Sequence, residues 1–182
     1  RSIPLTGEKT EAVEAVASAL SIPTAVPEGW TCFRRTGDDA AISKDGVAMS
    51  GGAAAILTRG TEVRFVAPTA EYVKLVAGHV GIRGCGPFDL TFTPGGITGT
   101  IEGRMRTLVT TWPERITRPM FLLDGRRWYA GWSDDPSIGK GTPTPQFSLA
   151  FAVTGGRQAI EVREWRYPNQ PPVPARKVLR LP

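Results

Sequence analysis

Strict alternation of apolar and polar residues is the feature that most constrains how this chain folds. In residues 62–65, 88–93 and 146–153, every second residue is a large apolar one. A period of two places such residues on one face of a β-strand and their neighbours on the other. We therefore expect strands with one buried face, packed around a common core.

Further strands are predicted over residues 99–112, 119–124 and 126–132. In residues 158–167 the apolar phase switches after Val162, which predicts a β-bulge near Arg163–Glu164. The 21 glycines and 16 prolines are spread along the chain rather than clustered, and this punctuation is typical of many short strands joined by turns. About eight to ten strands result, which predicts an all-β fold. The fold class that we expect is an eight-stranded antiparallel jelly-roll sandwich with short helices and extended N- and C-terminal arms.

Two segments have helical spacing instead. Residues 8–20 form the first, a short amphipathic helix that either serves as a docking arm or packs on its own domain. The second is 68–77, in which Tyr72, Leu75 and Val76 fall on one helical face after a proline that a first helical turn tolerates.

These patterns divide the chain into three parts. Residues 1–29 form an N-terminal arm with a short helix, 30–167 the jelly-roll sandwich, and 168–182 a proline-rich basic C-terminal arm. Of the net charge of +5, a share of +4 lies in residues 157–182, which hold six basic and two acidic residues: Arg157, Arg163, Arg166, Arg176, Lys177 and Arg180 against Glu161 and Glu164. A solvated face is one interpretation, and contact with nucleic acid or an acidic neighbour is the other. The candidate contacts for a polyanion or neighbour are Arg176, Lys177 and Arg180.

Neither a membrane span nor a catalytic motif is predicted. The chain has no apolar run of about 18 residues, so we expect no membrane partner. It begins at Arg1 with no apolar segment before it, from which we expect a processed chain. His79 is the only histidine, and no nucleophile elbow accompanies it. The lysine of segment 137–142 is followed by Gly141 where a phosphate loop needs Ser or Thr. One histidine and two separated cysteines are a poor metal set, so we predict no catalytic residue, cofactor or metal.

Cys32 and Cys85 leave the compartment open. In a secreted protein they would form one disulfide, worth about 4 kcal/mol in the chain-entropy model. In a reducing cytosol they would be two small buried apolar residues.

An aromatic cluster gives the one candidate ligand platform. If residues 126–132 form one strand, Trp128 and Trp132 point to the same side of it. Exposed, they would stack on sugar rings or bases; buried, they belong to the core, which is the interpretation we favour.

Four segments together resemble the jelly-roll coat proteins of picorna-like viruses, including the small coat subunits of comovirus-type plant viruses. They are the expected helix at 71–76 that runs through HVGIRG into the strand 88–93, the basic strand GRMRTLV that ends at Trp112-Pro113, the alternating strand 146–153, and the last strand AIEVR followed by a proline-rich arm. The resemblance covers roughly residues 60–175 as a pattern of elements.

The resemblance implies a structural coat protein that self-assembles or co-assembles with other coat subunits into an icosahedral shell in the host cytoplasm, around genomic RNA. Such a subunit is not an enzyme; it needs a rigid β core and arms that tie neighbours together. The alternative is a secreted β-sandwich, either a carbohydrate-binding module with Trp128 and Trp132 as its platform or a polysaccharide-active enzyme with a carboxylate pair in a groove.

Overall fold

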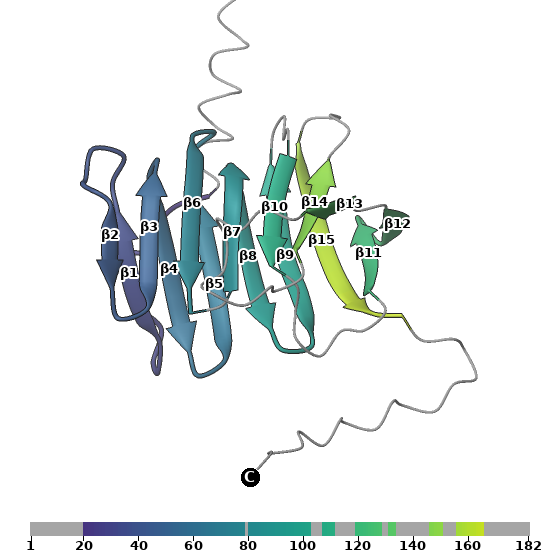
Figure 1. Cartoon of the computed structure of the whole chain (residues 1–182), viewed down its shortest axis with the longest axis horizontal. Helices are drawn as coiled ribbons and strands as arrows, with labels where there is room; N and C mark the ends of the chain where they lie inside the picture. The colour runs from purple at the N-terminus through teal and green to yellow at the C-terminus, as the bar shows by residue number, and fades with distance from the viewer. Residues whose placement is uncertain are drawn as a thin grey trace, which may run out of the picture.

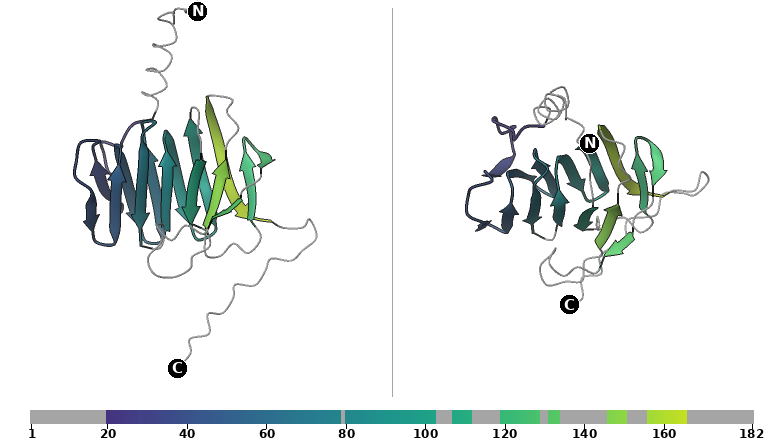
Figure 2. Two further views of the ribbon diagram at one scale, coloured as in Figure 1. Left: turned by 45° about the horizontal axis from the view of Figure 1, so that its top comes forward. Right: turned by 90° about the horizontal axis from the view of Figure 1, so that it is seen from above.

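The computed structural model describes residues 20–78, 80–102, 107–111, 119–128, 131–133, 146–150 and 156–165. Within these ranges the chain forms fifteen strands and no helix. Every strand pairing is antiparallel, and the strands form one eight-stranded and one seven-stranded sheet (Figure 1). The two sheets lie in two layers when the molecule is seen from above (Figure 2). The expected all-β sandwich is therefore confirmed, with more strands than the eight predicted.

The order of strands is as follows. The eight-stranded sheet runs β1 (Thr31–Arg35), β4 (Ala54–Arg59), β5 (Glu62–Ala67), β8 (Phe88–Thr93), β9 (Gly96–Glu102), β15 (Arg157–Glu164), β11 (Pro119–Leu123) and β12 (Arg126–Trp128). The seven-stranded sheet runs β13 (Gly131–Ser133), β14 (Gln146–Ala150), β10 (Thr107–Thr111), β7 (Val80–Cys85), β6 (Tyr72–Ala77), β3 (Val47–Gly51) and β2 (Ile42–Lys44).

Two-residue turns close two of the hairpins. Asp45-Gly46 joins β2 to β3 with φ of 52° and 75°, and Asp124-Gly125 joins β11 to β12 with φ of 49° and 73°. Two successive positive φ values are the signature of a type I′ turn, whose twist matches that of the flanking strands. Asp followed by Gly accepts this geometry at little cost, so both hairpins are fixed locally by sequence.

Successive hairpins alternate between the two sheets. The hairpin β2–β3 lies in the seven-stranded sheet, β4–β5 in the eight-stranded sheet, β6–β7 in the seven-stranded sheet and β8–β9 in the eight-stranded sheet. Each hairpin pairs with the previous one in its own sheet, so both sheets grow in the same direction along the sandwich. In a jelly roll, by contrast, Greek-key connections return a strand beside an earlier one. The strand order does not confirm the jelly-roll connectivity.

The main core lies between the sheets and contains the apolar residues that alternation predicted on β5 and β8. Phe65 is fully buried, and its ring meets that of Phe92 edge to face at a centroid distance of 5.3 Å. Such an arrangement adds about 0.5–1.5 kcal/mol beyond the burial of apolar area. From the seven-stranded sheet, Val73, Leu75 and Ile82 enter the same core with no exposed surface.

A second, smaller core lies on the outer face of the eight-stranded sheet. Leu57 and Val66 point away from the main core, yet neither has any exposed surface. Ile22 and Trp30 pack against them, so residues 20–30, which we call the strap, pass over this face of β4 and β5. The Arg59 guanidinium lies over the Trp30 ring at 4.6 Å and closes one side. This part of the predicted arm 1–29 is thus attached to the sandwich.

The helix predicted over residues 68–77 is wrong, because Tyr72–Ala77 is strand β6. The segment satisfies both periods, since Leu75 and Val76 suit a helix while Val73, Leu75 and Ala77 suit a strand. Pairing with β3 on one side and β7 on the other buries Val73 and Leu75 completely. Tertiary pairing therefore overrides the local helical pattern.

Two predicted strands are each divided between the sheets. Segment 99–112 contains the end of β9 and the whole of β10, and segment 126–132 contains β12 and most of β13. The predicted bulge near Arg163–Glu164 is also wrong, because β15 pairs with β11 in continuous register up to Glu164. Trp165 follows the strand, so the change of phase marks its end. The predicted helix 8–20, apart from Leu20, and the arm 168–182 lie outside the described residues.

Candidate functional site

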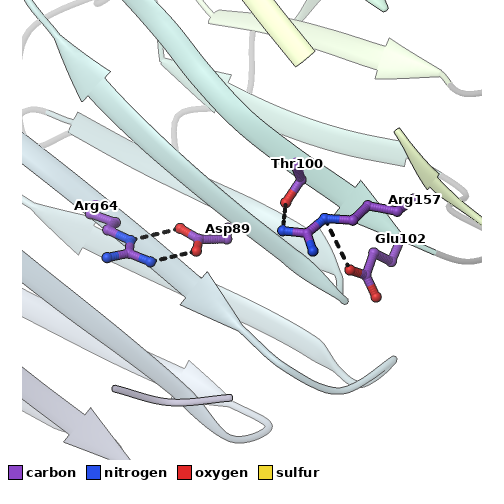
Figure 3. A network of polar contacts seen from close by, with 5 residues as sticks. All are labelled: Arg64, Asp89, Thr100, Glu102 and Arg157. Atoms are coloured by element: carbon purple, nitrogen blue, oxygen red, sulfur yellow. Dashed lines mark hydrogen bonds and ion pairs between the residues drawn. The ribbon is translucent and has the colours of Figure 1, made fainter. Parts of the chain in front are cut away.

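The clearest polar constellation lies on the outer face of the eight-stranded sheet, and we call it the polar ladder (Figure 3). Arg64 on β5 binds Asp89 on β8 through two hydrogen bonds, 2.8 Å from Nε to Oδ1 and 2.6 Å from Nη2 to Oδ2. The Arg64 side chain is 35% exposed and that of Asp89 is 19% exposed. The hydrogen bond with Asp89 raises the pKa of Arg64, against the opposing effect of partial burial.

The ladder continues on β9 and β15. Thr100 is the direct register partner of Asp89, and Arg157 Nη2 donates to the Thr100 hydroxyl over 3.5 Å. Arg157 Nε lies 3.5 Å from Oε1 of Glu102, whose side chain is only 2% exposed. A carboxylate this deeply buried needs a compensating charge, and Arg157 supplies it from the solvent side.

The ladder brings two carboxylates, those of Asp89 and Glu102, onto one face of neighbouring strands. This is the kind of pair that a polysaccharide-cleaving site would need. However, both oxygens of Asp89 accept bonds from Arg64, and Glu102 faces Arg157. Arg64 neutralises Asp89 through two hydrogen bonds, and Arg157 lies within ion-pair distance of Glu102 Oε1, which accepts no hydrogen bond from a described residue. One pair joins β5 to β8 and the other joins β9 to β15, which is a structural role.

A second polar cluster is centred on the buried guanidinium of Arg35, at the end of β1. Arg35 donates to the backbone oxygens of Thr36 at 3.1 Å and Gly52 at 3.0 Å, and also to those of Asp39 and Gly51. Its side chain thereby joins the loop after β1 to the crossing between β3 and β4. The Thr36 backbone N–H donates to Asp39 at 2.7 Å, and this bond lowers the pKa of Asp39.

The two cysteines are free and lie on opposite outer faces of the sandwich. Cys32 packs against the second core on the eight-stranded sheet, whereas Cys85 is the register partner of the outward-facing Tyr72 on the seven-stranded sheet. Stacked sheets are about 10 Å apart, and a disulfide requires Cα atoms within about 7 Å. The disulfide that the sequence left open therefore cannot form within one chain.

The two candidate platform tryptophans do not share a strand. Trp128 lies on β12, at the edge of the eight-stranded sheet, and pairs with Phe121, which packs against the main core. Trp132 lies on β13, at the edge of the seven-stranded sheet, and pairs with Phe147. Both strands lie at the same end of the sandwich (Figure 1). At this end Arg127 covers the ring of Trp165 at 4.2 Å.

The remaining candidates fall outside the described residues: His79, Trp112, and the basic residues Arg176, Lys177 and Arg180. In the part of the chain that the structure describes, no three His, Cys, Asp or Glu side chains come together as metal ligands. Nor does any helix there have the length and apolarity to span a membrane.

Sequence reasoning missed the ladder and a pair of cations, Lys74 and Arg83, on the outer face of the seven-stranded sheet. Both depend on strand register between residues that come together only in the folded sheets, for which one sequence offers no signal.

Comparison with known proteins adds no relative. No family model matches the chain, and no curated protein or solved structure is significantly similar to it.

Proposed function

We propose that the chain is a structural coat protein subunit that assembles, with itself or with sister subunits, into an icosahedral shell around a viral genome. The strap is the observation that carries this proposal. Its residues Leu20, Ile22 and Trp30 are buried or half-buried, and the latter two pack on the outer face of β4 and β5. The strap is therefore anchored on the sandwich through Ile22 and Trp30, and an anchored segment of this kind suits a subunit whose arms tie neighbours together.

The polar ladder gives the proposal a second support. A shell subunit must keep its shape when many copies contact one another. Paired charges across β5 and β8, and across β9 and β15, hold the outer face of the eight-stranded sheet in register. Neutralised pairs also allow another subunit to approach without a large repulsive field.

The position of the cysteines argues for a reducing compartment. The secreted alternative relied on a Cys32–Cys85 disulfide, which the geometry excludes within one chain. A coat subunit assembled in a host cytoplasm has no need of this bridge.

A carbohydrate-binding sandwich is the second candidate. It is favoured by Trp128 and Trp132, which come from different sheets yet both lie at the β12–β13 end. Titration with soluble polysaccharides, followed by tryptophan fluorescence, tests it. Saturable quenching that disappears in Trp128→Ala and Trp132→Ala variants would favour this candidate over the shell.

Sedimentation of the native material tests the shell directly, with absorbance followed for both protein and nucleic acid. We expect particles in the megadalton range. If native material with all of its partner chains sediments only as a slow species near the chain mass of 19.6 kDa, the proposal is wrong.

Two strap variants test the observation that carries the proposal. Ile22→Asp places a charge in the second core and should release the strap, reducing particle yield while the main core stays folded. Val26→Asp is the matched control, because Val26 lies in the same segment but is 43% exposed. Equal particle yields for the two variants would contradict the role given to the strap.

A further inference from the structure

The outward side chains of β15 follow a charge pattern that is complementary to itself. They belong to Arg157, Ala159, Glu161 and Arg163. Ile160 and Val162, which alternate with them, point into the main core. Ala159 therefore lies midway between a positive and a negative side chain. When a second copy of the strand is turned end for end, with Ala159 facing Ala159, each Arg157 faces the Glu161 of the other copy.

These side chains are open to solvent. That of Arg157 is 57% exposed and that of Glu161 is 42% exposed, and Ala159 is also exposed. On the neighbouring strand β9, register places Thr98 beside Glu161 and Thr100 beside Ala159. We call these five residues, on β9 and β15, the dyad face. On the other side of β15, the outward Leu122 of β11 is buried, so the dyad face ends there.

The centre of the dyad face consists of small side chains. Ala159 and Thr100 lie in one row across the two strands, so a second backbone can approach closely there. Arg157 and Glu161 lie two residues to either side and are long enough to reach across. Asp89 continues the row on β8, but its two hydrogen bonds from Arg64 neutralise it, so two copies would not bring bare carboxylates together.

The contacts that the charged residues already make leave capacity for more. Arg157 uses Nε toward Glu102 and Nη2 toward Thr100, each over 3.5 Å (Figure 3), whereas a guanidinium has five N–H donors. The Glu161 Oε1 lies 3.3 Å from Arg163 Nε, and a carboxylate accepts about four hydrogen bonds. Exposed ion pairs of this kind are weak, so both residues are able to bind a second partner.

The charges around the dyad face also cancel. They form the pairs Arg64–Asp89, Arg157–Glu102 and Arg163–Glu161. The chain as a whole carries +5, which opposes contact between two copies through any strongly basic surface. A face with balanced charges avoids this repulsion, and its self-complementary pattern favours a second copy over an unrelated partner.

We propose that the dyad face is a two-fold interface between two copies of this chain, with Ala159 against Ala159 at the axis and an Arg157–Glu161 ion pair on each side. This inference deepens the proposed function by naming one contact between coat subunits, and it rests on that function only for the larger particle. The dimer itself requires only two folded chains.

Sedimentation velocity of the full chain over a concentration series at low salt tests the interface. We expect a dimer whose fraction rises with concentration and falls with added salt. Ala159→Arg and Ala159→Glu each place two like charges opposite one another at the axis, so either variant alone should dimerise at least about tenfold more weakly. An equimolar mixture of the two should dimerise again, because opposite charges then meet at the axis.

A second position and a control complete the test. Glu161→Arg places like charges opposite Arg157 of the other copy and should also weaken the dimer, while the contact of Arg157 with Glu102 stays in place. Ala41→Arg makes the same change of charge at an exposed alanine beside β2, at the other end of the sandwich (Figure 1). It should dimerise as the wild type does. Thermal unfolding of every variant establishes that it is folded.

The outcomes separate this inference from the shell proposal. A wild-type chain that stays monomeric at every concentration would overturn the dyad face, even if that face bound another protein. Equal dimerisation of Ala159→Arg and Ala41→Arg, or a mixture that does not recover, would do the same. If Ala159→Arg still assembled into normal particles, the shell would stand without the dyad face. A chain that forms the recoverable dimer but no particle would support the dyad face and contradict the shell.

Discussion

Arg64 and Asp89 meet across β5 and β8 through two parallel hydrogen bonds of 2.8 and 2.6 Å, although 25 residues separate them in the chain. The guanidinium and carboxylate planes match in this geometry, which is the strongest form of ion pair in proteins. Because the pair joins two hairpins, β4–β5 and β8–β9, it stabilises the register between them rather than within either one.

Asp89→Asn should lower the free energy of unfolding by about 1–2 kcal/mol, measured by urea denaturation. The effect stays below that of a fully buried pair because Arg64 is 35% exposed. Asp45→Asn is the control: its contact with Lys44 is 3.9 Å long and well exposed, so we expect a change within about 0.5 kcal/mol. A double-mutant cycle of Asp89→Asn with Arg64→Gln should show a coupling energy between the two residues. If the two losses of unfolding free energy simply added, the ion pair would be contradicted.

Leu57→Ala should lower the free energy of unfolding by about 2–4 kcal/mol, the range for a buried leucine. Leu57 faces away from the main core and is buried through the second core, to which the strap contributes Ile22 and Trp30. If the strap did not cover this face in solution, the Leu57→Ala variant would lose much less unfolding free energy. Val26→Ala, in the exposed part of the strap, serves as the neutral comparison in the same assay.

Much of the strand pattern could be predicted from the sequence, because alternation reports directly on a half-buried strand. The alternation that includes Phe65 marks β5, and the alternation of Phe88 and Phe92 marks β8. The prediction failed at β6, where Val73 and Leu75 fit a strand but Leu75 and Val76 also fit a helix. Only the two neighbouring strands decide between these periods.

Two hairpin turns are also marked by their residue types alone, Asp45-Gly46 and Asp124-Gly125. These signals suffice to locate β2, β3, β11 and β12, of which β2 and β3 are not among the strands predicted from the apolar pattern. By contrast, the order of strands could not be predicted, nor could contacts such as Arg64–Asp89, because they depend on which hairpins become neighbours.

Gly99→Ala should be among the most damaging small substitutions in the chain. Gly99 has a φ of 150°, and a Cβ there would overlap the backbone oxygen of Asp89. The backbone of β8 cannot move aside as the flexible end of a side chain could. We therefore expect a loss of about 3 kcal/mol or more in unfolding free energy. Gly46→Ala provides the comparison: its φ is 75° but the space around it is open, so strain alone should cost about 1–2 kcal/mol. Equal losses would show that the close approach of β8 and β9 at Gly99 is absent.

Asp39→Asn should change how stability depends on pH. The hydrogen bond from the Thr36 backbone N–H is the main cause that lowers the Asp39 pKa from its ordinary value of 3.8, and Arg35 contributes. A carboxyl whose pKa is lower in the folded than in the unfolded protein stabilises the fold at any pH above its unfolded-state pKa. This stabilisation is lost as the pH falls through its folded-state pKa. The difference in unfolding free energy between wild type and variant should therefore be constant above about pH 5 and shrink below about pH 4. Urea midpoints at a series of pH values measure it, and a difference that persists unchanged into strong acid would contradict the assignment.

Both cysteines should be found as thiols in the native protein. Cys32 and Cys85 are half-buried on opposite outer faces, too far apart for a bridge within the chain. Alkylation in denaturant without reductant, followed by mass spectrometry, should therefore add two groups per chain. Exposure to mild oxidant should produce dimers linked between chains rather than a monomer with an internal bridge, and Cys85→Ser and Cys32→Ser would identify the thiol responsible. A native monomer that takes up no alkylating group until it is reduced would require β1 and β7 to lie in contact, and would overturn the two-layer arrangement itself.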